Sequence, residues 1–383
     1  MDRPTDDAVA DLDSAAFCGA PHEAYQRLRQ QGDSTLCRIE GAVVRGFFTR
    51  PAVLQVLRDR NFVADEYPSQ AILGLECGDG YRTSEAYRRL RRVLADRAFL
   101  DEWRRRIAMA ARALLAQHAP AGRLCLVRDY AQPLMLQVTG SLLNTDALTV
   151  NRWGEAFSII ADEGGQPAPR TLAAGQELLV HVAREFAGSD ADPFTVCRAL
   201  RDLYGERSVE EAAKALVVLL AAGHGTTSDM IVNAALDLLQ RGSSLAEQLA
   251  TPAALEAATE EALRVNPSVQ QVFRRATRHC QVGPAEVGSG ESILLSLASA
   301  NCDERTQAEQ GARSREAGGR HVAFGLGPSY CIGSAFARVA IQEGLAALAA
   351  QIPSAQLSGE ILEWKPSAIL RGVRAATLVF EPA

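Results

Sequence analysis

The sequence of 383 residues contains very little lysine and no closely spaced cysteines. Lys214 and Lys365 are the only lysines among 40 basic residues, a bias that we attribute to codon usage rather than to function. The eight cysteines are well separated, and the shortest spacing, from Cys18 to Cys37, is 19 positions. A zinc site or a CxxC redox pair needs much closer spacing, so the pattern excludes both.

Long apolar runs and targeting segments are also lacking. The longest strongly apolar run covers residues 215–222, whereas a bilayer span needs about 20 apolar residues. The first residues are acidic and polar, which is unlike a signal or transit peptide, so we expect a cytoplasmic protein with reduced cysteines. The formal net charge of −6 argues against a dedicated nucleic-acid binder. No linker or repeat interrupts the chain, so we expect one domain over residues 1–383.

The apolar spacing predicts a mainly α chain with small β-sheets. The clearest helix begins at Ser208 and Glu211, which form a capping box, and continues to Arg241. Shorter helices are predicted around Tyr25–Leu28, around 107–115, over 251–266 and after the glycines at 325–333. A strand is predicted at 292–297, a loop at 301–320, and a terminal hairpin between 369–372 and 377–380.

A glycine-rich segment from Phe324 to Arg338 gives one cysteine unusual surroundings. Its glycines at 325, 327 and 333 allow the backbone to approach a bound group closely. Cys331 stands just before a predicted helix, whose free N–H groups stabilise a thiolate. A lone cysteine is most often a packing residue. This setting instead favours a metal ligand, above all for the iron of a flat cofactor.

Two further patterns have both a purely structural interpretation and a functional one. Gly223 and Gly225 lie inside the long helix beside Thr226, which can bond back to an earlier carbonyl and open a notch for a ligand or water. Close helix packing at the glycines explains that pattern equally well. Glu261 and Arg264 share one helix face, and by themselves they read as a solvated surface pair.

Together, these three motifs resemble the cytochrome P450 family in order and spacing. The Cys331 loop is similar to that family's haem-thiolate loop, the 222–227 notch to its oxygen-binding groove, and the Glu261–Arg264 pair to its ExxR pair. The resemblance extends along nearly all of the chain and is of the bacterial type without an N-terminal anchor. It implies a mainly α fold with small β-sheets around a buried haem, present as a monomer.

The resemblance also implies a role for particular residues. Cys331 would be the axial thiolate of haem b, and Thr226 with Gly223 and Gly225 would line the dioxygen site. Glu261 and Arg264 would form a buried network with Arg315, or with Arg313 as the alternative. The remaining haem contacts would come from Phe324, Gly325, Tyr87, Arg91, Arg274, Ser329 and Gly333. Substrate contacts would come from Ala222, Gln270, Gln271, Val272 and Leu370.

The sequence departs from the family pattern at several of these positions. Gly225 replaces the usual Asp or Glu of the acid–alcohol pair, so the route of protons to bound dioxygen is open. His224, beside it, is either a structural residue or a replacement proton donor. Ser329 and Tyr87 replace charged or histidine partners of the haem propionates, and each still donates a hydrogen bond without charge.

The predicted function is therefore that of a haem-thiolate monooxygenase. It would hydroxylate, epoxidise or oxidatively cyclise a specialised small molecule of secondary metabolism, with electrons from NAD(P)H through a ferredoxin reductase and a ferredoxin. Residues 81–112 hold ten arginines against four acids, which gives +6 and suits an acidic ferredoxin. The alternatives are an atypical enzyme of coupling, rearrangement or peroxide chemistry, and a non-catalytic relative that recruits a carrier protein.

Overall fold

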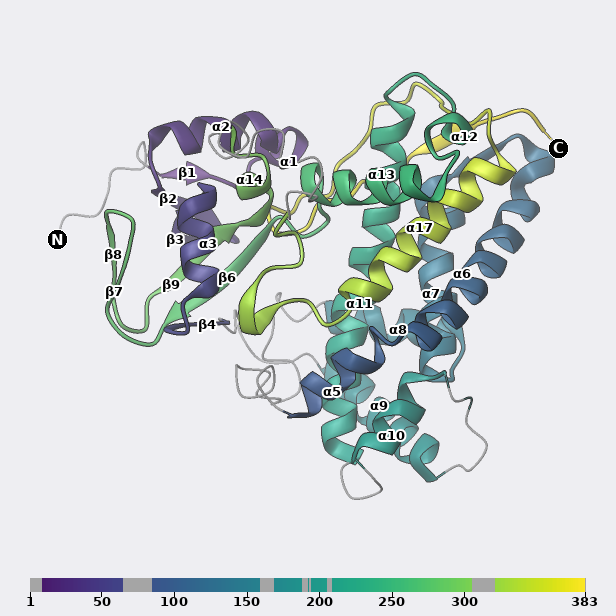
Figure 1. Ribbon diagram of the computed structural model, residues 1–383, viewed down its shortest axis with the longest axis horizontal. Coiled ribbons are helices and arrows are strands. Elements are labelled where there is room, and N and C mark those ends of the chain that lie inside the picture. Colours follow the sequence, from purple (N-terminus) through teal and green to yellow (C-terminus); the bar gives the residue numbers. More distant parts are fainter. Residues whose placement is uncertain are drawn as a thin grey trace. The chain divides into compact units, whose positions relative to one another are not determined.

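The computed structural model describes residues 9–64, 85–158, 169–187, 192, 194–204, 209–304 and 321–382 (Figure 1). The chain divides into two compact units, and each unit is built from three separate stretches of sequence. The first unit takes its residues from Met1–Asp65, Glu260–Cys331 and Leu362–Arg374. The second takes them from Glu66–Thr259, Ile332–Ile361 and Ala375–Ala383. No single linker therefore separates the units, and the expectation of one domain stays a prediction.

The first unit is organised around a six-stranded sheet in the order β1-β2-β3-β9-β6-β4. Its strands are β1 (Ala10–Asp11), β2 (Ser34–Ile39), β3 (Ala42–Phe47), β4 (Phe62–Ala64), β6 (Gln271–Ala276) and β9 (Ser292–Ser296). The β1–β2 and β3–β9 pairs are parallel, whereas β2–β3, β6–β9 and β4–β6 are antiparallel. A separate hairpin joins β7 (Cys280–Val282) to β8 (Ala285–Val287). The predicted strand at 292–297 is confirmed as β9.

Short helices pack with this sheet, namely α1 (Ala15–Gly19), α2 (Pro21–Gln31), α3 (Arg50–Arg58) and α14 (Leu297–Asn301). The buried side chains include Phe47, Val56, Leu57, Ile293 and Leu295, which belong to one apolar cluster. The predicted helix around Tyr25 and Leu28 is confirmed as α2, and both side chains are buried. Apolar burial of this kind is the main stabilising contribution to the unit.

The second unit is mainly helical. Its helices are α5 (Glu85–Val93), α6 (Arg97–His118), α7 (Gln132–Leu143), α8 (Ala147–Ser158), α9 (Pro169–Ala187), α10 (Val196–Tyr204), α11 (Val209–Leu239), α12 (Leu245–Gln248) and α17 (Ser334–Gln351). A π-helical turn at Leu126–Ala131 leads into α7. α13 (Pro252–Val265) contributes residues to both units. The predicted helices over 208–241, 251–266 and after 333 are confirmed as α11, α13 and α17, and the one around 107–115 is the centre of the longer α6.

Helix α11 packs against α7, α9 and α17 and extends along this unit (Figure 1). Residues 227–236 of this helix are buried on every side, which is typical of a core helix. Gly344 of α17 faces Ile231 of α11, and a Cβ there would come within 3.3 Å of the Ile231 side chain. The Tyr130 hydroxyl donates a 2.6 Å hydrogen bond to the Gly344 carbonyl oxygen, which adds a polar link between the π-helical turn and α17.

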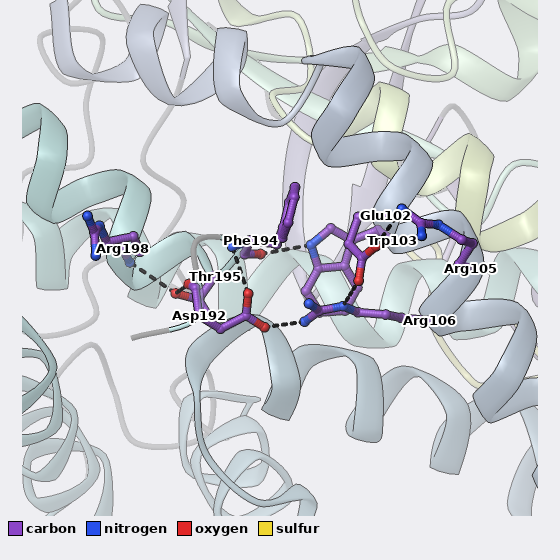
Figure 2. A network of polar contacts seen from close by, with 8 residues as sticks. All are labelled: Glu102, Trp103, Arg105, Arg106, Asp192, Phe194, Thr195 and Arg198. Carbon is purple, nitrogen blue, oxygen red and sulfur yellow. Dashed lines mark hydrogen bonds and ion pairs between the residues drawn. The ribbon is translucent and has the colours of Figure 1, made fainter. Parts of the chain in front are cut away.

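A polar and aromatic network fastens the segment before α10 to α6 (Figure 2). Arg106 donates hydrogen bonds to Asp192 and to Glu102, and its guanidinium lies 5.2 Å from the centre of the Trp103 ring. The Trp103 indole donates to the Phe194 carbonyl oxygen at 2.9 Å. The Arg106–Asp192 ion pair and the indole bond therefore join this segment to α6, while the Arg106–Glu102 contact lies within α6 and orients the guanidinium.

The predicted terminal hairpin is wrong. Strand β11 (Thr377–Val379) pairs with β5 (Arg123–Cys125) and β10 (Gln356–Leu357) in a three-stranded antiparallel sheet. Leu370 instead forms an isolated bridge with Val269, and the Arg371 amide donates to the Ser268 carbonyl oxygen. The hairpin failed because the backbone partners of both segments are far away in sequence. The mainly α character with small sheets is confirmed.

Among the described residues, no helix combines the length and apolarity that crossing a bilayer requires. The predicted loop at 301–320 lies mostly outside the described residues, as do Arg313 and Arg315.

Candidate functional site

The loop that carries Cys331 is held by its own backbone. The Cys331 amide donates to the Phe324 carbonyl oxygen at 2.9 Å, and the Gly325 amide donates to the Val322 carbonyl oxygen at 2.8 Å. Gly325 and Gly327 adopt φ angles of +71° and +72°, a region that other residues rarely enter. Gly333 caps the N-terminus of α17, so the thiol lies just before a helix start, as the sequence predicts.

Gly327 has a second constraint besides its backbone angle. A Cβ built there would lie 2.6 Å from the Leu57 carbonyl oxygen, so only glycine allows the loop to lie this close to α3. Leu326, its neighbour, packs against the apolar cluster of the first unit. The glycine loop is therefore a fixed part of that unit, which suits a loop that presents a ligand.

The cysteines of the described residues differ in how deeply they are buried. Cys331 and Cys302 are half-buried, whereas Cys18, Cys37, Cys125, Cys197 and Cys280 are buried. Burial raises the pKa of both the Cys37 and the Cys197 thiol to about 12, so these two remain protonated and unreactive. No cluster of three or more His, Cys, Asp or Glu side chains suited to a metal occurs among the described residues.

The Glu261 and Arg264 side chains form a doubly hydrogen-bonded ion pair on α13. Both contacts are 2.8 Å long, from Nε to Oε2 and from Nη2 to Oε1. The pKa of Arg264 is raised, chiefly by its hydrogen bonds to Glu261. Among the described residues the pair is half-exposed rather than buried, with 45% of the Glu261 side chain accessible.

Asn301 connects this ion pair to the cysteine loop, a role that the sequence analysis missed. Arg264 Nη1 donates to the Asn301 carbonyl oxygen at 3.1 Å. The Asn301 side-chain oxygen accepts the Val322 amide proton at 2.7 Å. A single asparagine at the end of a short helix gives no recognisable signal in the sequence, because its role depends on two distant partners.

The glycine notch lies in the middle of α11. The Thr226 hydroxyl donates a 2.5 Å hydrogen bond to the Ala222 carbonyl oxygen, which is the back-bond that the sequence predicts. Apart from its own helix, a Cβ built at Gly223 or at Gly225 would meet no atom of the described residues within 4 Å. Within the described part of this unit, no neighbouring helix therefore packs closely against the two glycines.

The proposed propionate partners differ in their surroundings. Arg274 is buried on β6, and its guanidinium donates to the Phe273 carbonyl oxygen at 2.7 Å. Arg91 on α5 is exposed, and Ser329, Phe324 and Gly333 in the cysteine loop are half-buried. The side chain of Tyr87 lies outside the described part of the chain.

The proposed substrate contacts also fall into two groups. Ala222, Val272 and Leu370 keep accessible surface. Gln270 and Gln271, by contrast, are buried, and both side chains hydrogen-bond the Tyr25 hydroxyl at 2.9 Å. The Gln270 amide is fully paired, since its nitrogen also donates to the Pro267 carbonyl oxygen, whereas the buried Gln271 side-chain oxygen has no hydrogen-bond partner among the described residues. Both side chains are almost completely buried within their unit. The sequence analysis could not anticipate Tyr25 as their partner, 245 positions away.

No family model matches the chain. Among curated proteins, it is 27% identical to cytochrome P450 107B1 of Saccharopolyspora erythraea over 94% of both chains. It is 28% identical to the cytochrome P450 monooxygenase PikC of Streptomyces venezuelae, over 94% of this chain and 91% of that one. It is 29% identical to the cyclomarin C epoxidase CymV of Salinispora arenicola, over 76% of this chain and 78% of that one.

Solved structures of similar fold are also found. The crystal structure of CalO2 matches with a TM-score of 0.80 and 24% identity, over 98% of this chain and 99% of that chain. P450BioI, crystallised with a fatty-acid-loaded acyl carrier protein, matches with a TM-score of 0.78 and 22% identity, over 96% of this chain and 100% of that chain. At these identities the structures show a shared fold and nothing more specific.

Proposed function

Because this chain belongs to the cytochrome P450 family of haem-containing oxidoreductases, we propose that it is a monooxygenase that oxidises a specialised small molecule of secondary metabolism. The observation that carries the proposal is the structure of the loop around Cys331. The thiol of Cys331 is half-buried and lies just before the N-terminus of α17. The loop backbone holds it there, and only glycine fits at position 327 of that backbone. A thiolate in that setting fits the axial position of a haem iron. Bound haem would supply the iron that activates dioxygen.

The residues of this chain would bind and orient the cofactor. Cys331 would ligate the iron, and the Phe324 ring would pack beside the sulfur. Arg274 and Arg91 would neutralise the haem propionates, with Ser329 and Tyr87 as uncharged donors. Gly325 and Gly333 would let the backbone approach the ring closely.

Thr226 and the two notch glycines would shape the position where dioxygen and substrate meet. The Thr226 hydroxyl donates to the Ala222 carbonyl oxygen, which leaves its oxygen atom able to accept a proton-donating partner. No carboxylate stands at Gly225, and the space there has room for water or for a substrate hydroxyl. Proton delivery in this enzyme would therefore pass through Thr226 and mobile donors. Hydroxylation, epoxidation and oxidative ring closure all suit such a site.

The electrons would come from NAD(P)H through a ferredoxin reductase and a ferredoxin. Arg88, Arg89, Arg91 and Arg92 are exposed on α5, and this basic face would steer an acidic redox partner. Its attraction would weaken with salt, since exposed charges are screened over about 8 Å at physiological ionic strength.

Gly225 also favours one alternative function. Hydrogen peroxide is dioxygen that already carries two electrons and two protons. An enzyme that uses peroxide therefore depends less on an acidic residue that delivers protons at that position. Product formation with hydrogen peroxide, together with none in a ferredoxin-supported system, would favour that alternative over the monooxygenase.

The carbon monoxide difference spectrum of the reduced protein tests the central assignment. We expect the wild-type protein to bind haem and to show the thiolate-type band. Cys331→Ser should abolish the band, whereas Cys302→Ser, the matched change at the other half-buried cysteine, should keep it. An intact band in the Cys331 variant would overturn the ligand assignment, and protein that never retains haem would support the non-catalytic alternative.

A further inference from the structure

His321 lies ten positions before Cys331, and both of its ring nitrogens have a partner. Nδ1 is 3.1 Å from the Ala323 amide nitrogen, and Nε2 is 3.2 Å from Glu260 Oε2 on α13. Because a backbone N–H can only donate, Nδ1 is the acceptor, and the ring carries its proton on Nε2. The His321 Nε2–H therefore donates to the Glu260 carboxylate. Only 5% of the His321 side chain is accessible, so the two bonds leave the ring a single orientation.

The oriented ring packs against Phe324 in the cysteine loop. The two ring centres are 5.9 Å apart with an interplanar angle of 48°, and Phe324 in turn packs against Tyr330 at 6.4 Å. The Phe324 carbonyl oxygen accepts the Cys331 amide proton at 2.9 Å. A shift of the His321 ring would therefore move the residue whose backbone positions Cys331.

We propose that His321, oriented by Glu260, is a positioning residue for the Cys331 thiolate. It acts through Phe324, and it does not touch the cofactor. This inference rests on the proposed function, since it assumes that Cys331 is the haem ligand. It assigns to Glu260 a role separate from that of the neighbouring Glu261.

The two adjacent glutamates hold the same loop through different contacts. Glu261 acts through Arg264, whose guanidinium reaches Asn301, and Asn301 holds the Val322 amide. Glu260 acts through the His321 ring. Loss of the Glu260 contact therefore leaves the Glu261 connection in place, and the loop is expected to stay folded in Glu260 variants.

Three glutamate variants distinguish an effect on the position of the Cys331 thiolate from an effect on the stability of the whole protein. Glu260→Ala removes the acceptor of the His321 proton, whereas Glu260→Gln keeps an acceptor oxygen without the charge. Glu256→Ala, one turn earlier on the same helix at an exposed position, is the matched control. Each holoprotein would be reduced and bound to carbon monoxide at a temperature where circular dichroism shows it fully folded. The measurements are the rate at which the thiolate-type band is lost in mild urea and the midpoint potential of the haem.

We expect Glu260→Ala to lose the thiolate-type band about three to ten times faster than wild type, because a partly exposed hydrogen bond to a carboxylate contributes roughly that factor. Its midpoint potential should also shift. Glu260→Gln should restore most of both properties, and Glu256→Ala should match wild type. His321→Phe, which keeps a ring against Phe324 but removes both hydrogen bonds, should behave like Glu260→Ala.

Two outcomes would overturn the inference. In the first, Glu260→Ala unfolds at a lower temperature but, while folded, keeps the wild-type band lifetime and potential, which would mean a purely structural role. In the second, Glu256→Ala changes both properties as much as Glu260→Ala does. Failure of the proposed function would look different, since the wild-type protein itself would then lack a thiolate-type band.

Discussion

The imidazole of His224 on α11 lies directly against Gly154 on α8. A Cβ built at Gly154 would be 2.6 Å from His224 Cε1 and 2.9 Å from His224 Nε2, closer than real atoms approach. Thr226 follows two residues later, about 200° around the helix axis, and so lies on the opposite face. This arrangement favours the structural role of His224 over a replacement proton donor beside Thr226.

The contact predicts that Gly154→Ala destabilises the protein. Overpacking of a filled position costs about 1–3 kcal/mol, because the imidazole or the two helices must move. The free energy of unfolding in urea measures the effect. Gly19→Ala is the control, since a Cβ there meets nothing within 4 Å and the change should be nearly neutral. Equal stability of the two variants would show that His224 moves aside freely.

The open space at Gly225 predicts that an acid can be restored there. Gly225→Asp should fit without a clash at Cβ and should increase, several-fold, the share of NAD(P)H electrons that appear in product rather than in hydrogen peroxide. The physical reason is that a positioned general acid contributes about 10²–10⁴-fold to proton transfer. Gly225→Asn is the matched control, with similar size and no transferable acid proton. If Gly225→Asp and Gly225→Asn give the same ratio of product to hydrogen peroxide, proton delivery from residue 225 does not limit product formation.

The network around Arg106 predicts a dependence of stability on pH (Figure 2). The hydrogen bond from Arg106 lowers the pKa of Asp192. A carboxyl group with a lower pKa in the folded state stabilises the protein above its unfolded pKa, and the contribution is lost as the pH falls through the folded pKa. Asp192→Asn should therefore be less stable than wild type at neutral pH, by at most about 1 kcal/mol because the pair is partly exposed.

This difference should shrink at pH values below about 4, where the carboxyl group of the unfolded chain takes up its proton. Unfolding in urea from neutral pH to acid measures it for both proteins. Asp202→Asn is the control, because its partner Arg198 holds it in a more exposed pair within one helix. A stability difference that stays constant with pH would contradict the assigned ion pair.

Charge reversal at the exposed arginines of α5 is predicted to slow the reduction of the haem by its redox partner. Arg88→Glu or Arg92→Glu should reduce the rate of electron transfer from an acidic ferredoxin, most strongly at low ionic strength, while leaving substrate affinity unchanged. Stopped-flow reduction and substrate titration of the haem spectrum measure the two quantities. Arg241→Glu, an exposed change elsewhere, is the control. A wild-type reduction rate in both α5 variants would exclude this face as the docking surface.

Much of the local structure could be predicted from the sequence. The ends of α11, α13 and α17 follow from apolar periodicity, caps and glycines close to each helix terminus. The Cys331 loop and the Glu261–Arg264 pair could be found for the same reason, since their spacing alone brings the residues together. The terminal hairpin failed, because the partners of β11 lie at 123–125 and 356–357 and no local pattern identifies them.

By itself, then, the sequence determined the helices, the cysteine before a helix start and the threonine notch, all of which depend on contacts within a few residues. The tertiary structure alone decided that Gln270 and Gln271 bond to Tyr25, that His224 faces Gly154, and that Asn301 and His321 tie the cysteine loop to α13. The physical reason is that each of these contacts joins segments distant in sequence. Side chains of that kind gain their partners only when the core packs.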